Sequence, residues 1–279
     1  MTNYNTLWSS ATPGLIIFLI DQSASMQEEF IDGKNKAEFT ASVINETIND
    51  LILQCSSGNV VKDRLFVSLI GYGGKGGNSV DDVRSGYIGA FADNPLRFET
   101  ITKKIPDGEG GFVEIEDEIP IFIEPTCPEN GLTPMAEAFD FARRLIAAWI
   151  DKKPDNPAPV VINISDGFPF TGEHEEEEEI RRTANKAYEI MSMHMKDGNP
   201  LLFNIHLGIG LECRFEESSI ELPDDNAKFL FAISSKVPRA YKEVGRRYDF
   251  DIRPNSRGFI SNASPESFIK FISFGSSSK

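Results

Sequence analysis

Short runs of apolar residues recur along the chain and predict strands that are buried on both faces. Leu15–Ile20 is an unbroken run of six such residues, bounded by polar or turn-forming positions. Uninterrupted runs of this length are typical of a parallel sheet that is covered by helices on both sides. Further strands are predicted at Arg64–Tyr72, Pro159–Ser165, Leu201–Ile209 and Gly258–Asn262.

Amphipathic segments between these strands predict helices. Apolar residues recur at three- and four-residue steps in Ala37–Cys55, in Met135–Ile150, and in the segment from Glu175 to about Lys196. Shorter helices are predicted at Ala227–Ser235 and from Ser264 to about Ser273. The alternation of strands and helices favours right-handed βαβ crossovers, and hence an α/β fold.

The stretch 71–131 has no clear place in this alternation. Gly71–Gly77 fits a hairpin tip better than a phosphate-binding loop, because it lacks the P-loop order and no helical pattern follows it. Tyr87–Phe91 is a candidate edge strand, and Phe112–Glu118 and Ile119–Glu124 have extended patterns. We interpret the stretch as an insertion, since it has too few apolar residues to form a second core.

The composition is that of a globular protein with one domain. Of the 279 residues, 40% are hydrophobic and 25% are charged. We expect a single domain at 14–274, preceded by an N-terminal arm at 1–13 and followed by a disordered tail at 275–279. The net charge of −15 argues against nucleic acid or an anionic membrane as the main partner, because both attract basic surfaces.

The cysteines indicate a reducing compartment. Cys55, Cys127 and Cys213 are odd in number and widely spaced, so structural thiols are favoured over disulfides or a zinc site. Residues 1–13 have no basic start followed by an apolar core, so no signal peptide is expected. No apolar run reaches the length of a membrane span. The predicted location is therefore cytoplasmic, unless processing removes a leader that precedes this numbering.

Hard oxygen donors follow two of the predicted strands. Asp21, Ser23 and Ser25 stand at alternate positions after the first strand, Asp166 follows a later strand, and Thr133 precedes a predicted helix. Because parallel strands end at the same edge of a sheet, we expect Asp21 and Asp166 to lie close together. Carboxylate and hydroxyl oxygens suit Mg²⁺. Taken singly, Asp and Ser are also common turn residues, and Thr133 fits the N-cap of its helix.

Together these positions resemble the metal-ion-dependent adhesion site of von Willebrand factor A domains. The matching residues, in the family's order and separations, are Asp21-x-Ser23-x-Ser25, Thr133 and Asp166-Gly167. The likeness extends from about Gly14 to Phe274, and Leu230–Ser235 and Arg257–Ala263 look most like the bacterial cytoplasmic members associated with tellurite resistance. The resemblance implies a doubly wound, mostly parallel, Rossmann-like sheet with one antiparallel edge strand and helices on both faces.

The resemblance also implies a protein-interaction module rather than an enzyme. Ser23, Ser25 and, in one state, Thr133 would hold Mg²⁺ directly, with Mn²⁺ or Ca²⁺ as alternatives. Asp21 and Asp166 would act largely through bound waters. A Glu or Asp of a partner protein would complete the coordination. Bacterial relatives are often encoded beside kinases, phosphatases or ATPases, which suggests a partner in a signalling or stress-response complex.

Two other functions stay open. Asp21 at a strand end also fits a metal-dependent hydrolase or phosphotransferase, although Ser23 stands where a haloacid-dehalogenase-type site has a second Asp. The third hypothesis is a structural domain whose site is not used. The resemblance assigns no role to the five arginines at 239–257, and they fit a solvated surface better than an anion or phosphoprotein contact.

Overall fold

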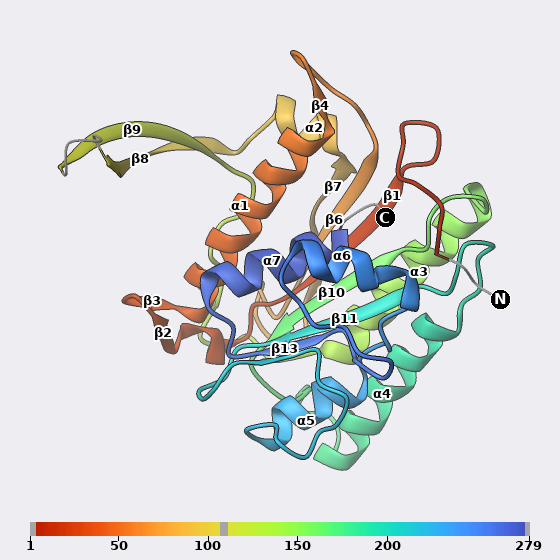
Figure 1. The fold of residues 1–279 in the computed structure, drawn as a ribbon. Coiled ribbons are helices and arrows are strands. Elements are labelled where there is room, and N and C mark those ends of the chain that lie inside the picture. Colours follow the sequence, from red (N-terminus) through yellow and green to blue (C-terminus); the bar gives the residue numbers. More distant parts are fainter. Residues whose placement is uncertain (1–3, 107–110, 277–279) are drawn as a thin grey trace.

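A seven-stranded sheet forms the centre of the molecule (Figure 1). The computed structural model describes residues 4–106 and 111–276. The strand order is β12-β13-β11-β10-β1-β6-β7, and the two outermost strands are antiparallel to their neighbours. The five central strands are parallel: β1 (Gly14–Asp21), β6 (Leu65–Tyr72), β10 (Val160–Ser165), β11 (Leu201–His206) and β13 (Phe259–Ser261).

Helices cover both faces of this sheet (Figure 1). One face packs against α1 (Lys36–Cys55), α2 (Ile88–Asp93), α6 (Lys242–Arg247) and α7 (Pro265–Ser276). The other face packs against α3 (Met135–Lys152), α4 (Glu176–Ser192) and α5 (Asp225–Ala232).

Strand β1 shows why the sheet needs both layers. Its side chains point to alternate faces, so that Ile16 and Phe18 lie in the first core and Ile17 and Leu19 in the second. All eight residues of the strand are buried. The α/β class with a mostly parallel sheet and helices on both sides is therefore confirmed.

The antiparallel edge strand lies earlier in the chain than predicted. The edge strand β7 spans Val80–Tyr87, whereas the predicted strand at Tyr87–Phe91 covers only the last residue of β7 and the start of α2. Strand β7 is partly exposed and rich in charged residues, so it lacks the apolar run that identifies the central strands. The short strand β12 (Cys213–Arg214) is antiparallel at the other edge, which makes two such strands instead of one.

Several elements lie outside the main sheet. A two-stranded ribbon, β8 and β9, projects from the body of the molecule (Figure 1). The remaining bounds are β2 (Glu29–Ile31), β3 (Lys34–Asn35), β4 (Ser56–Ser57), β5 (Val60–Val61), β8 (Arg97–Pro106), β9 (Phe112–Ile121), and the 3₁₀ helices η1 (Ala24–Gln27) and η2 (Arg239–Tyr241). The predicted insertion at 71–131 thus contains an edge strand and a helix in addition to this ribbon.

Some element ends differ from the prediction. Helix α4 ends at Ser192 rather than near Lys196, and β11 ends at His206 rather than Ile209. The N-cap of α3 is Pro134 and no side chain caps this helix, so the prediction that Thr133 is the N-cap is wrong. Within the predicted tail, 275–276 belong to α7, and 277–279 lie outside the described residues.

The side chain of Asn45 fastens α1 to the segment that follows the projecting ribbon. Its amide nitrogen donates to the carbonyl of Ile123 at 3.0 Å. Its amide oxygen accepts from the backbone nitrogens of Phe122 at 2.7 Å and Ile123 at 3.0 Å. The buried side chain therefore satisfies three backbone groups that no neighbouring strand pairs.

We expect Asn45→Ala to lower the free energy of unfolding by about 2–4 kcal/mol, because it leaves three buried backbone groups without a hydrogen-bond partner. Urea denaturation measures this change. Asn49→Ala, on the same helix, is the matched control and should change stability by less than about 0.5 kcal/mol. Equal small effects for both variants would show that Asn45 does not hold this segment.

Candidate functional site

The carboxyl ends of β1 and β10 bring the first candidate residues together. The two strands are parallel neighbours, with Ile20 opposite Ile164. Directly beyond this pair, the carboxylate of Asp21 accepts a hydrogen bond from the hydroxyl of Ser165 at 2.6 Å. Its other oxygen accepts from the backbone nitrogen of Ser23 at 2.9 Å. Asp21 is only 1% exposed, so its carboxylate is fixed inside the sheet edge.

A chain of hydroxyl groups connects the turn after β1 with Asp166. The hydroxyls of Ser23 and Ser25 are 3.1 Å apart, and that of Ser25 donates to the carboxylate of Asp166 at 3.0 Å. The helix η1 starts directly after Ser23 and places Ser25 at the surface. The structure therefore brings Asp21, Ser23, Ser25 and Asp166 into one cluster at the carboxyl edge of the sheet.

Thr133 lies in a loop beside this cluster without joining its hydrogen bonds. The backbone nitrogen of Ala24 donates to the carbonyl of Gly131 at 3.0 Å, which places the loop next to η1. Thr133 itself exchanges two backbone hydrogen bonds with Phe170, at 2.8 and 3.0 Å. Within the described part of the chain, no hydrogen bond links the Thr133 hydroxyl to the other four residues.

Lys36 is a member of the cluster that sequence reasoning missed. Its ammonium donates to the carboxylates of Asp166 at 2.7 Å and Glu28 at 2.6 Å. The side chain is 8% exposed, while those of Asp166 and Glu28 are 4% and 66% exposed. Burial by itself lowers the pKa of Lys36, but the two carboxylates outweigh it and raise the pKa above its usual value. Lys36 lies in a polar stretch, where no sequence pattern distinguishes it from a surface lysine.

Burial dominates the electrostatics of Asp21. Loss of solvent, and next the negative charge of Asp166, raise the pKa of Asp21 to about 7 against the hydrogen bonds from Ser165 and Ser23. Burial and the nearby Asp21 likewise raise the pKa of Tyr72. The site therefore has an excess of negative charge that Lys36 only partly compensates.

The cluster has donors of the kind that a hard divalent cation binds. Two carboxylates and two hydroxyls converge there, and Mg²⁺ prefers such oxygen ligands. Among the described residues, no group of three or more His, Cys, Asp or Glu side chains is arranged as a metal site. The cluster has only two acidic side chains, and its other side-chain oxygens are hydroxyls.

His206 is close to the cluster but is a structural residue. Its ring is 1% exposed, and its Nδ1 lies 2.9 Å from the hydroxyl of Ser261. Burial lowers the pKa of His206 against the opposing influence of Asp224. His206 therefore belongs to the buried, hydrogen-bonded interior of β11.

The glycine-rich segment is a hairpin tip, as predicted. It connects the antiparallel strands β6 and β7. Gly73 has a φ of 83°, and a Cβ atom there would lie 2.3 Å from the carbonyl oxygen of Leu132. This close approach packs the tip against the loop that carries Thr133.

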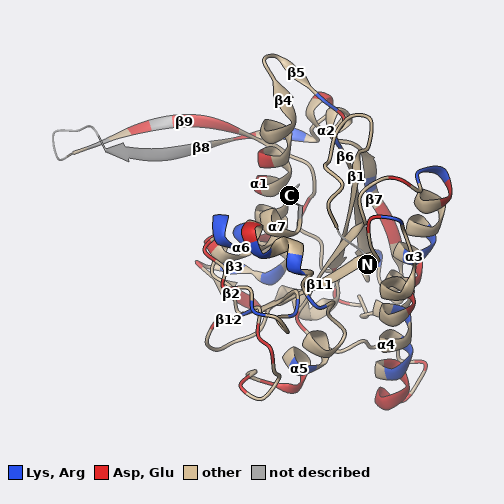
Figure 2. Ribbon diagram, turned by 45° about the vertical axis from the view of Figure 1, so that its right-hand side comes forward, with Lys and Arg blue, Asp and Glu red and all other residues tan. Residues whose placement is uncertain are grey.

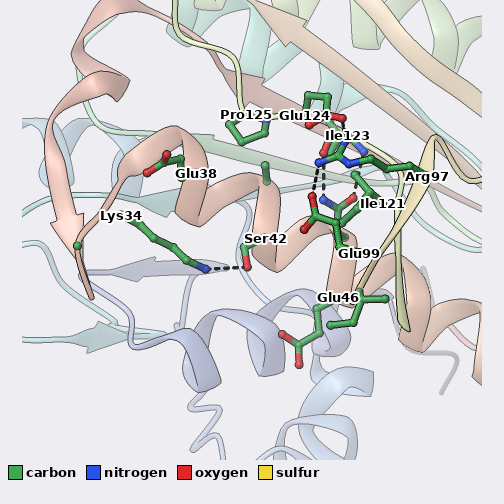
Figure 3. A pocket seen from close by; sticks show the side chains of 14 residues that line it. Lys34, Glu38, Ser42, Glu46, Arg97, Glu99, Ile121, Ile123, Glu124 and Pro125 are labelled. Atoms are coloured by element: carbon green, nitrogen blue, oxygen red, sulfur yellow. Dashed lines mark hydrogen bonds and ion pairs between the residues drawn. The ribbon is translucent and has the colours of Figure 1, made fainter. Parts of the chain in front are cut away.

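Two hollows with basic residues in their lining lie away from the cluster. One of about 500 Å³ separates α1 from the base of β9, and Lys34, Ser42 and Arg97 are among its lining residues (Figure 3). The other, of about 380 Å³, is lined by Arg239, Lys242 and Arg253, and it lies beyond the amino end of β13. Figure 2 shows basic residues around α6 and acidic residues at the start of α4 and along β9, in three separate parts of the molecule. Neither hollow includes a residue of the cluster.

Comparisons with known proteins give structural likeness alone. No family model matches the chain, and no curated protein matches it. The pilus adhesin SpaC from Lactobacillus rhamnosus GG has 14% identity and a TM-score of 0.45, over 72% of this chain and 25% of that one. The minor pilin PilB from Streptococcus sanguinis has 9% identity and a TM-score of 0.45, over 94% and 60%. The vWF domain of the type V pili tip protein Mfa5 from Porphyromonas gingivalis has 14% identity and a TM-score of 0.29, over 57% and 39%.

These findings overturn the family assignment made from the sequence. That assignment was a von Willebrand factor A protein with a complete metal-ion-dependent adhesion site, closest to the tellurite-resistance-associated members. No family model or curated protein supports it, and the similar structures named above are pilus proteins. The chain spans less than two thirds of the length of those structures.

The predicted cytoplasmic location is not supported by these comparisons either. No helix in the described ranges has both the length and the apolar character needed to cross a membrane.

Asp21 should make stability depend on pH. Its pKa is about 7 in the folded chain and near 3.8 when unperturbed, so the folded state binds an extra proton between these values and stability falls as pH rises through that window. In Asp21→Asn, the amide can still form hydrogen bonds with Ser165 and Ser23, but it does not titrate, so stability no longer falls with rising pH for this reason. In EDTA, we expect the stability of the variant relative to the unchanged protein to increase by about 2–4 kcal/mol between pH 4 and pH 7.5.

Denaturant unfolding at several pH values tests this expectation. Ser219→Ala serves as the control; it removes no titratable group, so its stability difference from the unchanged protein should not vary with pH. A difference for Asp21→Asn that is equally independent of pH would contradict the raised pKa.

Proposed function

We propose that this chain is a protein-interaction module that depends on a divalent cation. The supporting observation is the single cluster of oxygen donors that the ends of β1 and β10 form. In this proposal Ser23 and Ser25 hold Mg²⁺ directly, and Mn²⁺ or Ca²⁺ are alternatives. Asp21 and Asp166 orient its bound waters, and Thr133 contributes from the neighbouring loop in one state of the site.

An acidic side chain is the proposed contact on the partner protein. The chain has a net charge of −15, so it repels acidic proteins in general. A cation at the cluster attracts a Glu or Asp locally and leaves the general repulsion in place. Such a contact combines affinity with selectivity, because only a partner that places its carboxylate at the cation gains from it.

Exposed apolar residues on the same sheet edge support an interaction surface. Ile209 and Leu211, in the loop after β11, are 90% and 88% exposed. This loop starts beside the cluster, since the backbone nitrogen of Leu207 donates to the carbonyl of Ser165 at 3.0 Å. Phe170, which pairs with Thr133, is also largely exposed. Large apolar side chains left in solvent close to one site are typical of binding surfaces.

The buried position of Asp21 argues against the alternative enzyme. A nucleophilic aspartate must reach its substrate, but both oxygens of Asp21 accept hydrogen bonds and the residue is closed off from solvent. We therefore favour binding over hydrolysis or phosphotransfer. We also propose that the strands are arranged as in a von Willebrand factor A domain. This is a hypothesis about the fold alone and implies no evolutionary relationship.

Direct titration with MgCl₂ tests the cation site. We expect saturable binding by calorimetry, and Ser25→Ala should weaken it about tenfold or more because one donor is lost. Ser25 is exposed, so the variant should fold normally. Ser219→Ala is the matched control and should bind as the unchanged protein does. Equal binding by both variants would place the cation elsewhere.

The partner contact should depend on both the cation and the apolar loop. In pull-downs from a lysate of the source organism, we expect a partner in Mg²⁺ that is lost in EDTA and with Ser25→Ala. The double variant Ile209→Ser, Leu211→Ser should lose the partner while its Mg²⁺ affinity stays within about twofold, because neither side chain carries a donor group. A partner retained under all four conditions would locate the interface away from this edge.

A further inference from the structure

The position of Lys36 is unusual for a site that accepts a divalent cation. Lysine is rarely buried unless it is paired, and this one is buried against Asp166, one of the proposed cation-binding residues. Its ammonium and a metal ion would carry charges of the same sign. The cluster therefore already contains one positive charge before any metal arrives.

The backbone around Lys36 fixes where its side chain starts. The capping box of Asn35 and Glu38 begins α1 at this residue, with hydrogen bonds of 2.8 and 2.9 Å. The backbone nitrogen of Lys36 also donates to the carbonyl of Glu28 at 3.0 Å. The lysine is thus held beside both of its carboxylate partners by contacts that do not involve its charge.

The two partners of Lys36 differ in their surroundings. Asp166 is almost fully buried within the cluster, whereas Glu28 is mainly in solvent. When another cation neutralises Asp166, the ammonium of Lys36 can still remain paired with Glu28. A lysine with a single buried partner would have no such second position.

Lys36 is not needed to keep Asp166 in place. One carboxylate oxygen of Asp166 already accepts from Ser25 at 3.0 Å. The carbonyl of the same residue accepts from the side chain of Asn226 at 3.3 Å. Two other elements therefore hold this residue, and the contribution of Lys36 is mainly its charge.

We propose that Lys36 is an internal counter-cation that regulates how tightly the cluster binds a divalent cation. Its ammonium neutralises Asp166 when no metal is present, and Glu28 retains that ammonium when a metal is bound. This inference rests on the proposed function, because it concerns the same site. It explains how a cluster with two buried carboxylates can remain folded without a metal.

Titration of four proteins with MgCl₂ tests the inference. We expect Lys36→Met to tighten Mg²⁺ binding about tenfold or more, because a like charge in a poorly solvated site is removed. Glu28→Gln should weaken binding about threefold, because the ammonium then has only Asp166 as a charged partner. Lys34→Met is the matched control; this lysine lies two residues earlier and donates to Ser42 instead, so its removal should leave the affinity unchanged.

Thermal unfolding gives a second readout that does not depend on a partner. Without metal, Lys36→Met should have a lower Tm than the unchanged protein, because Asp166 loses its counter-charge. Added Mg²⁺ should raise the Tm of this variant more than that of the unchanged protein. If Lys36→Met does not fold, Lys36→Gln removes the charge but keeps a hydrogen-bond donor, and we expect the same tightening.

The possible outcomes separate this inference from the proposed function. If the unchanged protein binds Mg²⁺ and loss of Lys36 leaves the affinity equal or weaker, the inference is wrong and the cation site stands. If only the Lys36 variants bind Mg²⁺, the inference holds, and in the unchanged protein Lys36 prevents the cluster from binding the metal. If no variant binds Mg²⁺, both the site and the inference fail.

Discussion

The parallel pairing of β1 with β10 is the constraint on which the rest of the site depends. It places Asp21 beside Ser165 and Asp166, although about 145 residues of chain separate them. Because both strands are buried on both faces, their register is fixed by two cores at once, and a slip would expose apolar residues on either side. Asp21 is therefore held at the end of a buried strand, while Ser25 lies exposed at the edge of the sheet where the loops begin.

Charge, rather than shape, distinguishes this edge from the rest of the molecule. Burial of Asp21 near Asp166 opposes the ionised form of Asp21, which is why its pKa rises to about 7. Lys36 and the hydroxyls of Ser23 and Ser25 offset part of this cost. An excess of negative charge in a rigid, poorly solvated place is what a divalent cation can relieve, and the same excess explains why a lysine is present.

The sequence predicts the central part of this arrangement because the residues involved follow clear patterns. Continuous apolar runs identify the buried strands, and polar residues directly after them identify the sheet edge that Asp21 and Asp166 share. Lys36 and β7 could not be found in this way. The lysine is buried only because α1 packs against the sheet, and β7 is an edge strand whose exposed positions are charged. The family assignment failed because the likeness seen along the chain rested on short motifs, and no family model or curated protein matches the chain as a whole.

Thr133 shows how the site and the proposed interaction surface are linked. Its two backbone hydrogen bonds to Phe170 form a small bridge between the loop before α3 and the loop after β10. Neither residue can shift far without the other, since separate movement would break both bonds in a partly buried place. Phe170 is exposed, so any approach of Thr133 toward the cluster would also reposition an apolar side chain at the same edge. In the proposed function, this bridge would couple a movement of Thr133 to the position of the Phe170 side chain.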